Sequence, residues 1–330
     1  MIVDAHLDIA YNALLNGHNY LGDPPPGYII SKKALTDAGV GLACVTLMCA
    51  PESARKMIRN LAGPAGSNPG DLFYRTGRDA ALIAQAQIGY YRSVGLELIG
   101  DRERLERYVN NWRPGQLAAI LILEGADAVV TPAALGEWAR SGLRIVGLAW
   151  TRTRYAGGTG RPGGVSAAGR KLLGAMRRHR LILDLSHMAD RAVADAFDQW
   201  HGPVMASHSN ARSLVPGDRQ ITDQTIRAIA ERNGMIGISL FAGHLRARGK
   251  ADIEDVVNQV VHMARITGST MHLGIGSDLD GGFPVDKAAI RSVSGLSEIA
   301  ARLRRQFSNE EVEGIMGANW LSFFQRSLPK

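Results

Sequence analysis

Eight short apolar runs recur along the chain, and most are followed by a polar or Gly-rich loop and a helix-like segment. Their near-continuous Val, Ile, Leu and Ala content is typical of strands that are buried on both faces of a parallel sheet. Eight such strand–helix units predict an α/β fold, a (β/α)₈ barrel of the TIM type. The runs comprise residues 1–9, 40–50, 117–125, 143–150, 181–187, 204–208, 235–241 and 272–278.

An open, doubly wound sheet is the alternative fold, because it uses the same alternation with fewer strands. Such sheets often carry a Gly-x-Gly-x-x-Gly turn that binds phosphate. The nearest match, Gly274-Ile275-Gly276, has Leu279 where the third glycine should stand. The sequence therefore favours the barrel.

Segments between the later runs have apolar residues at the three-to-four spacing of amphipathic helices. Asp190 and Thr222 are suitable N-caps for two of them, and Gly268 is a suitable C-terminal stop for another. The predicted helices are residues 167–179, 190–200, 222–233 and 253–267.

One connection, residues 51–116 between the second and third runs, is much longer than the others. It is predicted to hold a loop at residues 62–70, helices near 71–94 and 101–111, and a stray strand at 96–99. No other stretch resembles a linker. We therefore expect a single domain over residues 1–330, with an elaborated connection between strands 2 and 3.

Charge and hydropathy exclude several classes of partner. The formal net charge of +7 is modest for 330 residues and the basic clusters are short, so no nucleic-acid partner is expected. No apolar run approaches the roughly 20 residues of a membrane-spanning helix, and the amino terminus carries no export signal. Cys44 and Cys49 fall on opposite faces of one strand and are expected to be buried free thiols. These features predict a cytoplasmic protein without a membrane partner.

Polar residues that suit metal binding or catalysis gather at the ends of five apolar runs. All strand carboxyl ends of a (β/α)₈ barrel face the same way, so these side chains should converge over one mouth. Buried carboxylates and imidazoles are costly unless they are paired or bind a metal. The residues are His6, Asp8, Glu124, His187, His208 and Asp278.

The first run ends in His6-Leu7-Asp8. Residues two apart on a strand point to the same face, so His6 and Asp8 should project together into the mouth. An imidazole and a carboxylate suit zinc or another borderline divalent ion. His187 and His208, from neighbouring runs, could form a second nitrogen site.

Glu124 ends a run between these two groups, and its two carboxylate oxygens could bridge two cations. Asp278 could then accept a proton from an attacking water and later donate one. Among the other histidines, only His244 follows a strand closely enough to reach the mouth.

Five motifs in this order resemble those of the membrane dipeptidase (renal dipeptidase) family of zinc metallopeptidases, within the amidohydrolase-like barrels. They are Asp4-Ala5-His6-Leu7-Asp8, Leu123-Glu124-Gly125-Ala126, Leu183-Asp184-Leu185-Ser186-His187, Ser207-His208-Ser209 and Gly276-Ser277-Asp278-Leu279-Asp280-Gly281. The resemblance implies two zinc ions, one held by His6 and Asp8 and the other by His187 and His208. It also implies that Glu124 bridges them and that Asp278 is the catalytic acid/base, with Asp280 as the alternative.

The resemblance also assigns substrate contacts. Arg219 matches an arginine near the carboxylate end of the family's substrates, and a guanidinium can donate two parallel bonds to a carboxylate. Two positions depart from the pattern: Trp150 replaces a substrate-polarising histidine, and Phe241 replaces a carboxylate-binding tyrosine. The metal chemistry is therefore expected to be intact, with altered substrate contacts.

The leading hypothesis is a zinc-dependent dipeptidase that acts on short dipeptides, including those with a C-terminal D-residue. Trp150 and Phe241 keep open a binuclear hydrolase of another amide, a lactone or an ester. A barrel that binds metal or ligand without turnover is the third alternative. The resemblance also implies a homodimer.

Overall fold

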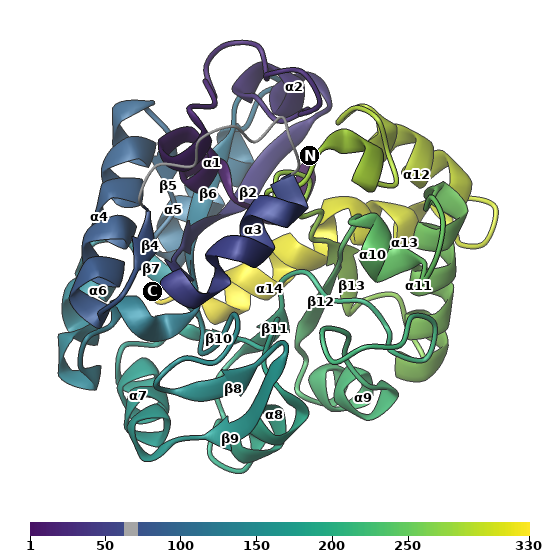
Figure 1. Cartoon of the computed structure of the whole chain (residues 1–330). Helices are drawn as coiled ribbons and strands as arrows, with labels where there is room; N and C mark the ends of the chain where they lie inside the picture. Colours follow the sequence, from purple (N-terminus) through teal and green to yellow (C-terminus); the bar gives the residue numbers. More distant parts are fainter. Residues whose placement is uncertain (63–71) are drawn as a thin grey trace.

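A closed barrel of parallel strands forms the centre of the computed structural model, which describes residues 1–62 and 72–330 (Figure 1). The main sheet has the order β2-β1-β13-β12-β11-β10-β7-β6-β5, and an additional pairing of β2 with β6 closes eight of these strands into a ring. This closure confirms the (β/α)₈ barrel and excludes the open sheet. The barrel strands are β1 (Ile2–Leu7), β2 (Val40–Met48), β6 (Ala118–Glu124), β7 (Leu143–Gly147), β10 (Ile182–Asp184), β11 (Val204–Ala206), β12 (Met235–Ile238) and β13 (Leu273–Ile275).

Every barrel strand lies inside a predicted run, but several runs extend beyond their strand. The run at residues 272–278, for example, contains only the short strand β13. The backbone turns away from the sheet where the polar residues begin, and both His187 (φ 66°) and Asp278 (φ 58°) have positive φ. Side chains in these sharp turns point over the mouth instead of continuing the ladder.

The four predicted helices are present as α7 (Ala167–Arg178), α8 (Asp190–Phe197), α9 (Asp223–Glu231) and α11 (Ile253–Thr267). Thr222 caps α9 by accepting a hydrogen bond from the Thr225 amide, and Gly268 ends α11 with φ 72°. The prediction of Asp190 as an N-cap is wrong, because Ala189 takes that position and Asp190 is the first helical residue. Asp190 instead forms an ion pair with Arg212.

The long connection between β2 and β6 contains more structure than predicted. The expected helices are α4 (Gly77–Ser93) and α5 (Arg102–Asn111), and the stray strand is β5 (Glu97–Leu98), which pairs with β6. The unpredicted elements are β3 (Ala50–Pro51), α3 (Arg55–Ala62) and β4 (Phe73–Tyr74). The loop predicted at residues 62–70 lies, apart from residue 62, outside the described residues.

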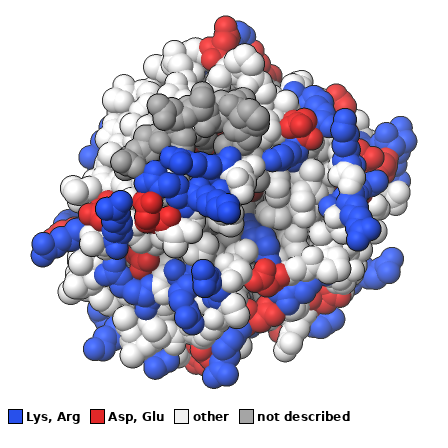
Figure 2. All heavy atoms as spheres, in the orientation of Figure 1, with Lys and Arg blue, Asp and Glu red and all other residues white. Residues whose placement is uncertain are grey.

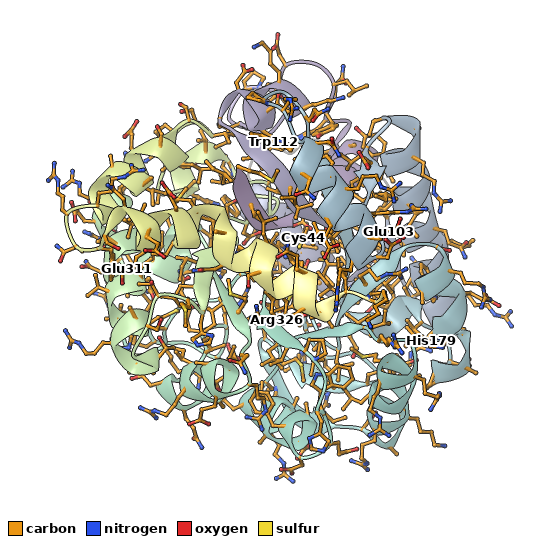
Figure 3. All side chains as sticks on the ribbon, turned by 180° about the vertical axis from the view of Figure 1, so that it is seen from behind. Cys44, Glu103, Trp112, His179, Glu311 and Arg326 are labelled. Atoms are coloured by element: carbon orange, nitrogen blue, oxygen red, sulfur yellow. The ribbon has the colours of Figure 1, made fainter. Side chains whose placement is uncertain are left out.

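Helix α14 (Asn319–Ser327) lies across the barrel at the end seen from behind (Figure 3). Its buried residues Trp320, Phe323 and Phe324 pack in one cluster with strand residues that include Cys44 and Ile122. The Trp320 indole N–H donates to the Ile275 carbonyl oxygen over 3.0 Å, so the one polar atom of this aromatic group is satisfied. The amino ends of the strands are therefore sealed by a close-packed apolar layer.

Two further sequence expectations concern thiols and membranes. Cys44 and Cys49 are both free and buried, as predicted. Within residues 1–62 and 72–330, no helix has the length and hydropathy needed to cross a membrane.

Candidate active site

The predicted metal ligands all lie at the carboxyl ends of barrel strands, and they converge on Glu124, the last residue of β6. One Glu124 oxygen (Oε2) lies 3.6 Å from Nε2 of His6. The other (Oε1) lies 3.1 Å from Nε2 of His187 and 3.5 Å from Nε2 of His208. The two oxygens of a single carboxylate therefore face different sets of histidines.

His6 and Asp8 project to the same side, as the strand periodicity predicts, with His6 Nε2 4.0 Å from Asp8 Oδ2. Leu7 points away and packs in the large apolar cluster around the barrel. His6, Asp8 and Asp278 form one group whose ligand atoms lie close enough to hold a metal ion, and His6, Glu124 and His208 form another. Nε2 of His6 is buried without a hydrogen-bond partner, so its free position suits a cation.

Ser207, to which the sequence analysis gave no role, contacts the Nδ1 atoms of two of the histidines. Its hydroxyl donates to Oδ2 of Asp184 over 2.7 Å. The same oxygen lies 3.2 Å from Nδ1 of His6 and 2.8 Å from Nδ1 of His208. With its proton donated to Asp184, the hydroxyl can accept from both Nδ1–H groups, and the Nε2 atoms of both rings then face Glu124.

Asp278 and Asp280 have different environments. Oδ1 of Asp280 accepts a hydrogen bond from the Asp8 amide over 2.8 Å, so this carboxylate braces the end of β1. Asp278 lines the cavity beside Asp8 and Glu124. Its position, unlike that of Asp280, allows contact with a bound molecule.

The buried ionisable groups perturb one another strongly. Burial raises the pKa of Asp278 to about 8, with Asp8 and Glu124 adding to the shift. Burial and Glu124 raise the pKa of Asp8 to about 7. Burial alone lowers the pKa of His6, but Glu124 and Asp8 raise it to about 10. Burial, aided by the nearby Arg219, lowers the pKa of His187 to about 4.

A cavity of about 340 Å³ opens above this cluster, and all three predicted substrate contacts line it: Arg219, Trp150 and Phe241. Arg219 is held by bonds from Nη2 to the His208 carbonyl oxygen (2.8 Å) and from Nη1 to the Ser209 hydroxyl (3.4 Å). Its Nε is buried without a partner. The site thus brings a guanidinium with unused donors next to the histidine cluster.

Helix α3 adds a second, unpredicted wall to the cavity. Met57 and Ile58 from this helix line the cavity with Tyr11 and Met48. Basic side chains gather over α3 on the same face of the molecule (Figure 2). The cavity therefore combines an apolar wall with a positively charged rim.

A family model described as membrane dipeptidase (peptidase family M19) matches residues 81–327. Among curated relatives, the chain is 34% identical over 237 residues to "Dipeptidase tcpJ" of Claviceps purpurea (strain 20.1), which covers 68% of this chain and 55% of that protein. It is 29% identical over 226 residues to an uncharacterized dipeptidase of Schizosaccharomyces pombe, covering 64% of this chain and 54% of the relative. The chain thus spans about half the length of these two relatives.

Solved structures share the fold over the whole chain. A crystal structure described as dipeptidase AC, a metallopeptidase of family M19, superimposes with a TM-score of 0.84 at 23% identity, covering 100% of this chain and 99% of the other. A metallopeptidase from Rhodobacter sphaeroides, bound to a phosphinate mimic of L-Ala-D-Ala, has a TM-score of 0.82 at 21% identity and 99% coverage of both chains. At these identities the likeness establishes the barrel architecture.

Proposed function

The chain belongs to the membrane dipeptidase family of metallopeptidases, and from that premise we propose that it is a zinc-dependent dipeptidase. The observation that carries the proposal is the position of Glu124. Its two oxygens approach His6 on one side and the pair His187 and His208 on the other. A lone structural carboxylate needs one partner, so the histidines that face both oxygens of this one support a bridge between two cation sites.

The residues fit two zinc ions in number and in kind. His6 and Asp8 would hold one ion, His187 and His208 the other, and Glu124 would give one oxygen to each. The contact from Ser207 supports this, because it engages Nδ1 of His6 and of His208 and leaves their Nε2 atoms on the side of Glu124. Zinc ions so bound lower the pKa of a water molecule and polarise a carbonyl group.

Asp278 is the proposed acid/base. Its carboxyl lines the cavity beside Asp8 and Glu124, where it can meet a bound molecule and exchange a proton with it. In the proposed mechanism it accepts the proton of the attacking water and passes it to the leaving amine. Asp280 is less suited to this role, because it is bonded to the amide of Asp8.

Arg219 is proposed to bind the C-terminal carboxylate of the substrate. Its Nε is buried without a partner, and within residues 1–62 and 72–330 no carboxylate forms an ion pair with it. The guanidinium is half-buried and keeps a donor without a hydrogen-bond partner, so the carboxylate of a bound substrate could complete its contacts. A substrate carboxylate held there would restrict the enzyme to short peptides, including those with a C-terminal D-residue.

A second candidate is a binuclear hydrolase of another amide, a lactone or an ester. Trp150 and Phe241 favour it, because both line the cavity at the positions where the family resemblance leads us to expect a histidine and a tyrosine. Small peptides remain the proposed partners, and a homodimer and a cytoplasmic location remain predictions.

Hydrolysis of a panel of L,L and L,D dipeptides tests the proposal, with N-blocked, C-amidated and lactone compounds as controls. The protein is assayed loaded with zinc and again after chelation. We expect chelator-sensitive cleavage that requires a free carboxylate. Metal-dependent cleavage of the control compounds alone would transfer the function to the second candidate.

A further inference from the structure

One histidine that lines the cavity has no part in the proposed mechanism. His244 belongs to α10 (Ala242–Leu245), the short helix that follows β12. It shares the cavity with Arg219 and Phe241. Its ring meets the Phe241 ring edge-on, with 4.9 Å between the ring centroids. His244 is therefore placed to contact whatever occupies the space beside Arg219.

A network of buried amides fixes α10 against the loop that carries Arg219. Nδ2 of Asn210 donates to the carbonyl oxygens of Ser239 (3.0 Å) and His244 (3.1 Å). From the same loop, Nε2 of Gln220 donates to the His244 carbonyl oxygen over 3.3 Å. Gln220 directly follows Arg219, so these bonds hold the guanidinium and the imidazole in one rigid arrangement.

The hydroxyl of Ser239 is the hydrogen-bond partner of Nδ1 of His244. Its oxygen accepts a hydrogen bond from the Phe241 amide over 3.3 Å and lies 3.0 Å from Nδ1 of His244. The hydroxyl proton can then be donated to Nδ1, which places the imidazole hydrogen on Nε2. Burial, together with the charges of Arg219 and His187, lowers the pKa of His244 and favours this neutral form.

We propose that His244 is a substrate-binding residue that donates its Nε2–H to the same C-terminal carboxylate that Arg219 binds. This inference rests on the proposed dipeptidase function. Arg219 and His244 can both donate, whereas the Phe241 ring, which packs against His244 and Phe283, has no donor. His244, three residues after Phe241, thus supplies a second polar contact to the carboxylate, which the Phe241 ring cannot make.

Binding of paired inhibitors to the zinc-loaded protein tests this role. The probes are two phosphinate dipeptide mimics, one with a free C-terminal carboxylate and one amidated, and their Kd values are measured by calorimetry. The variants are His244→Phe, which keeps a ring but loses the donor, and His244→Gln, which keeps a donor. His201→Phe, at an exposed histidine before β11, is the matched control.

We expect His244→Phe to weaken the free-carboxylate mimic by about tenfold to a hundredfold, as for a lost bond to a charged group. The amidated mimic should change by less than about twofold, His244→Gln should recover most of the affinity, and His201→Phe should have no effect. The assignment would be overturned if His244→Phe lost affinity equally for both mimics, or lost it for neither. Failure of the proposed function has a different signature, because the wild-type protein would then cleave no dipeptide.

Discussion

The two ends of the barrel interior are built from the same strands but have opposite chemistry. At the amino ends, Trp320, Phe323 and Phe324 of α14 complete an apolar layer. At the carboxyl ends, buried carboxylates, imidazoles and a guanidinium replace the apolar side chains, and Nε2 of His6 and Nε of Arg219 lack hydrogen-bond partners. The base is a closed apolar layer, whereas the mouth keeps the unpartnered polar atoms that the proposed metal and substrate sites would use.

The amino end of each strand therefore contributes mainly to stability, and the carboxyl end mainly to function. Close packing of large aromatic residues stabilises the base, since each buried apolar side chain contributes to the free energy of unfolding. The mouth opposes folding, because burying ionisable groups is unfavourable without a partner. Substitutions at the mouth should therefore reduce catalysis with little loss of stability, and substitutions at the base should do the reverse.

The largest effect is expected at the mouth for Asp278→Asn. Turnover should fall by about 10²–10⁴-fold, the contribution of a positioned general acid/base, while bound metal and the melting temperature stay close to wild type. Steady-state kinetics, metal content and thermal unfolding check the three expectations. Asp286→Asn, at an exposed position, is the matched control. Unchanged turnover in Asp278→Asn would refute its role.

At the base, Phe324→Ala should reduce stability and leave catalysis nearly unchanged. Removing this fully buried ring should lower the free energy of unfolding by about 3–5 kcal/mol, because a cavity replaces it. Denaturant unfolding measures the loss, and kcat/KM of the folded fraction should remain within about twofold of wild type, since the ring lies far from the reacting groups. A large loss of kcat/KM in fully folded protein would show that the two ends are coupled.

A smaller effect is expected for Arg219→Gln. Loss of the charged contact to the substrate carboxylate should raise KM for free dipeptides by about tenfold to a hundredfold. The C-amidated compounds should be affected far less. An equal effect on both classes would place the substrate carboxylate elsewhere in the cavity.

The smallest effect is a pH dependence of the metal-free protein. Burial raises the pKa of Asp8 from 3.8 to about 7 and that of Asp278 from 3.8 to about 8, and the carboxylates raise that of His6 from 6.5 to about 10. The folded chain then keeps protons that the unfolded chain releases, so stability falls as pH rises. The pKa of His187 is lowered to about 4, so this residue opposes the trend only below pH 6.5.

Thermal unfolding of chelated protein should therefore show a melting temperature that decreases from pH 6.5 to pH 8. The zinc-loaded protein should show a weaker decrease, because metal binding favours the deprotonated ligands. A metal-free protein that becomes more stable over this interval would contradict the assigned environment of the carboxylates.

The barrel strands and the gathering of ionisable side chains at the mouth could be predicted from the sequence, because ionisable residues directly after apolar runs are unusual. His6, Asp8 and Glu124 stand out in this way. Ser207 and Asp184 did not stand out, because a small polar residue at the end of a strand looks like a turn residue until the register of the strands is known. Their contact joins the ends of two neighbouring strands, where the Ser207 amide and hydroxyl both donate to the Asp184 carboxylate.

Helix α3 was missed for a different reason. Ile58 of this helix packs in a small cluster with Tyr11 and Met48, apart from the main core. Such a short segment gives little periodicity to detect, and its place over the cavity depends on tertiary contacts. The wall that shapes the substrate pocket therefore became visible only in the structure.

Titration of zinc into the chelated protein, with bound metal and dipeptide hydrolysis followed together, tests the central claim most directly. If Glu124 joins two cation sites, activity should rise to its maximum only as the second equivalent of zinc binds. Glu124→Gln should then bind less zinc and lose activity at every metal concentration. Full activity at one equivalent, or hydrolysis that survives complete chelation, would contradict a two-metal centre at the mouth of the barrel.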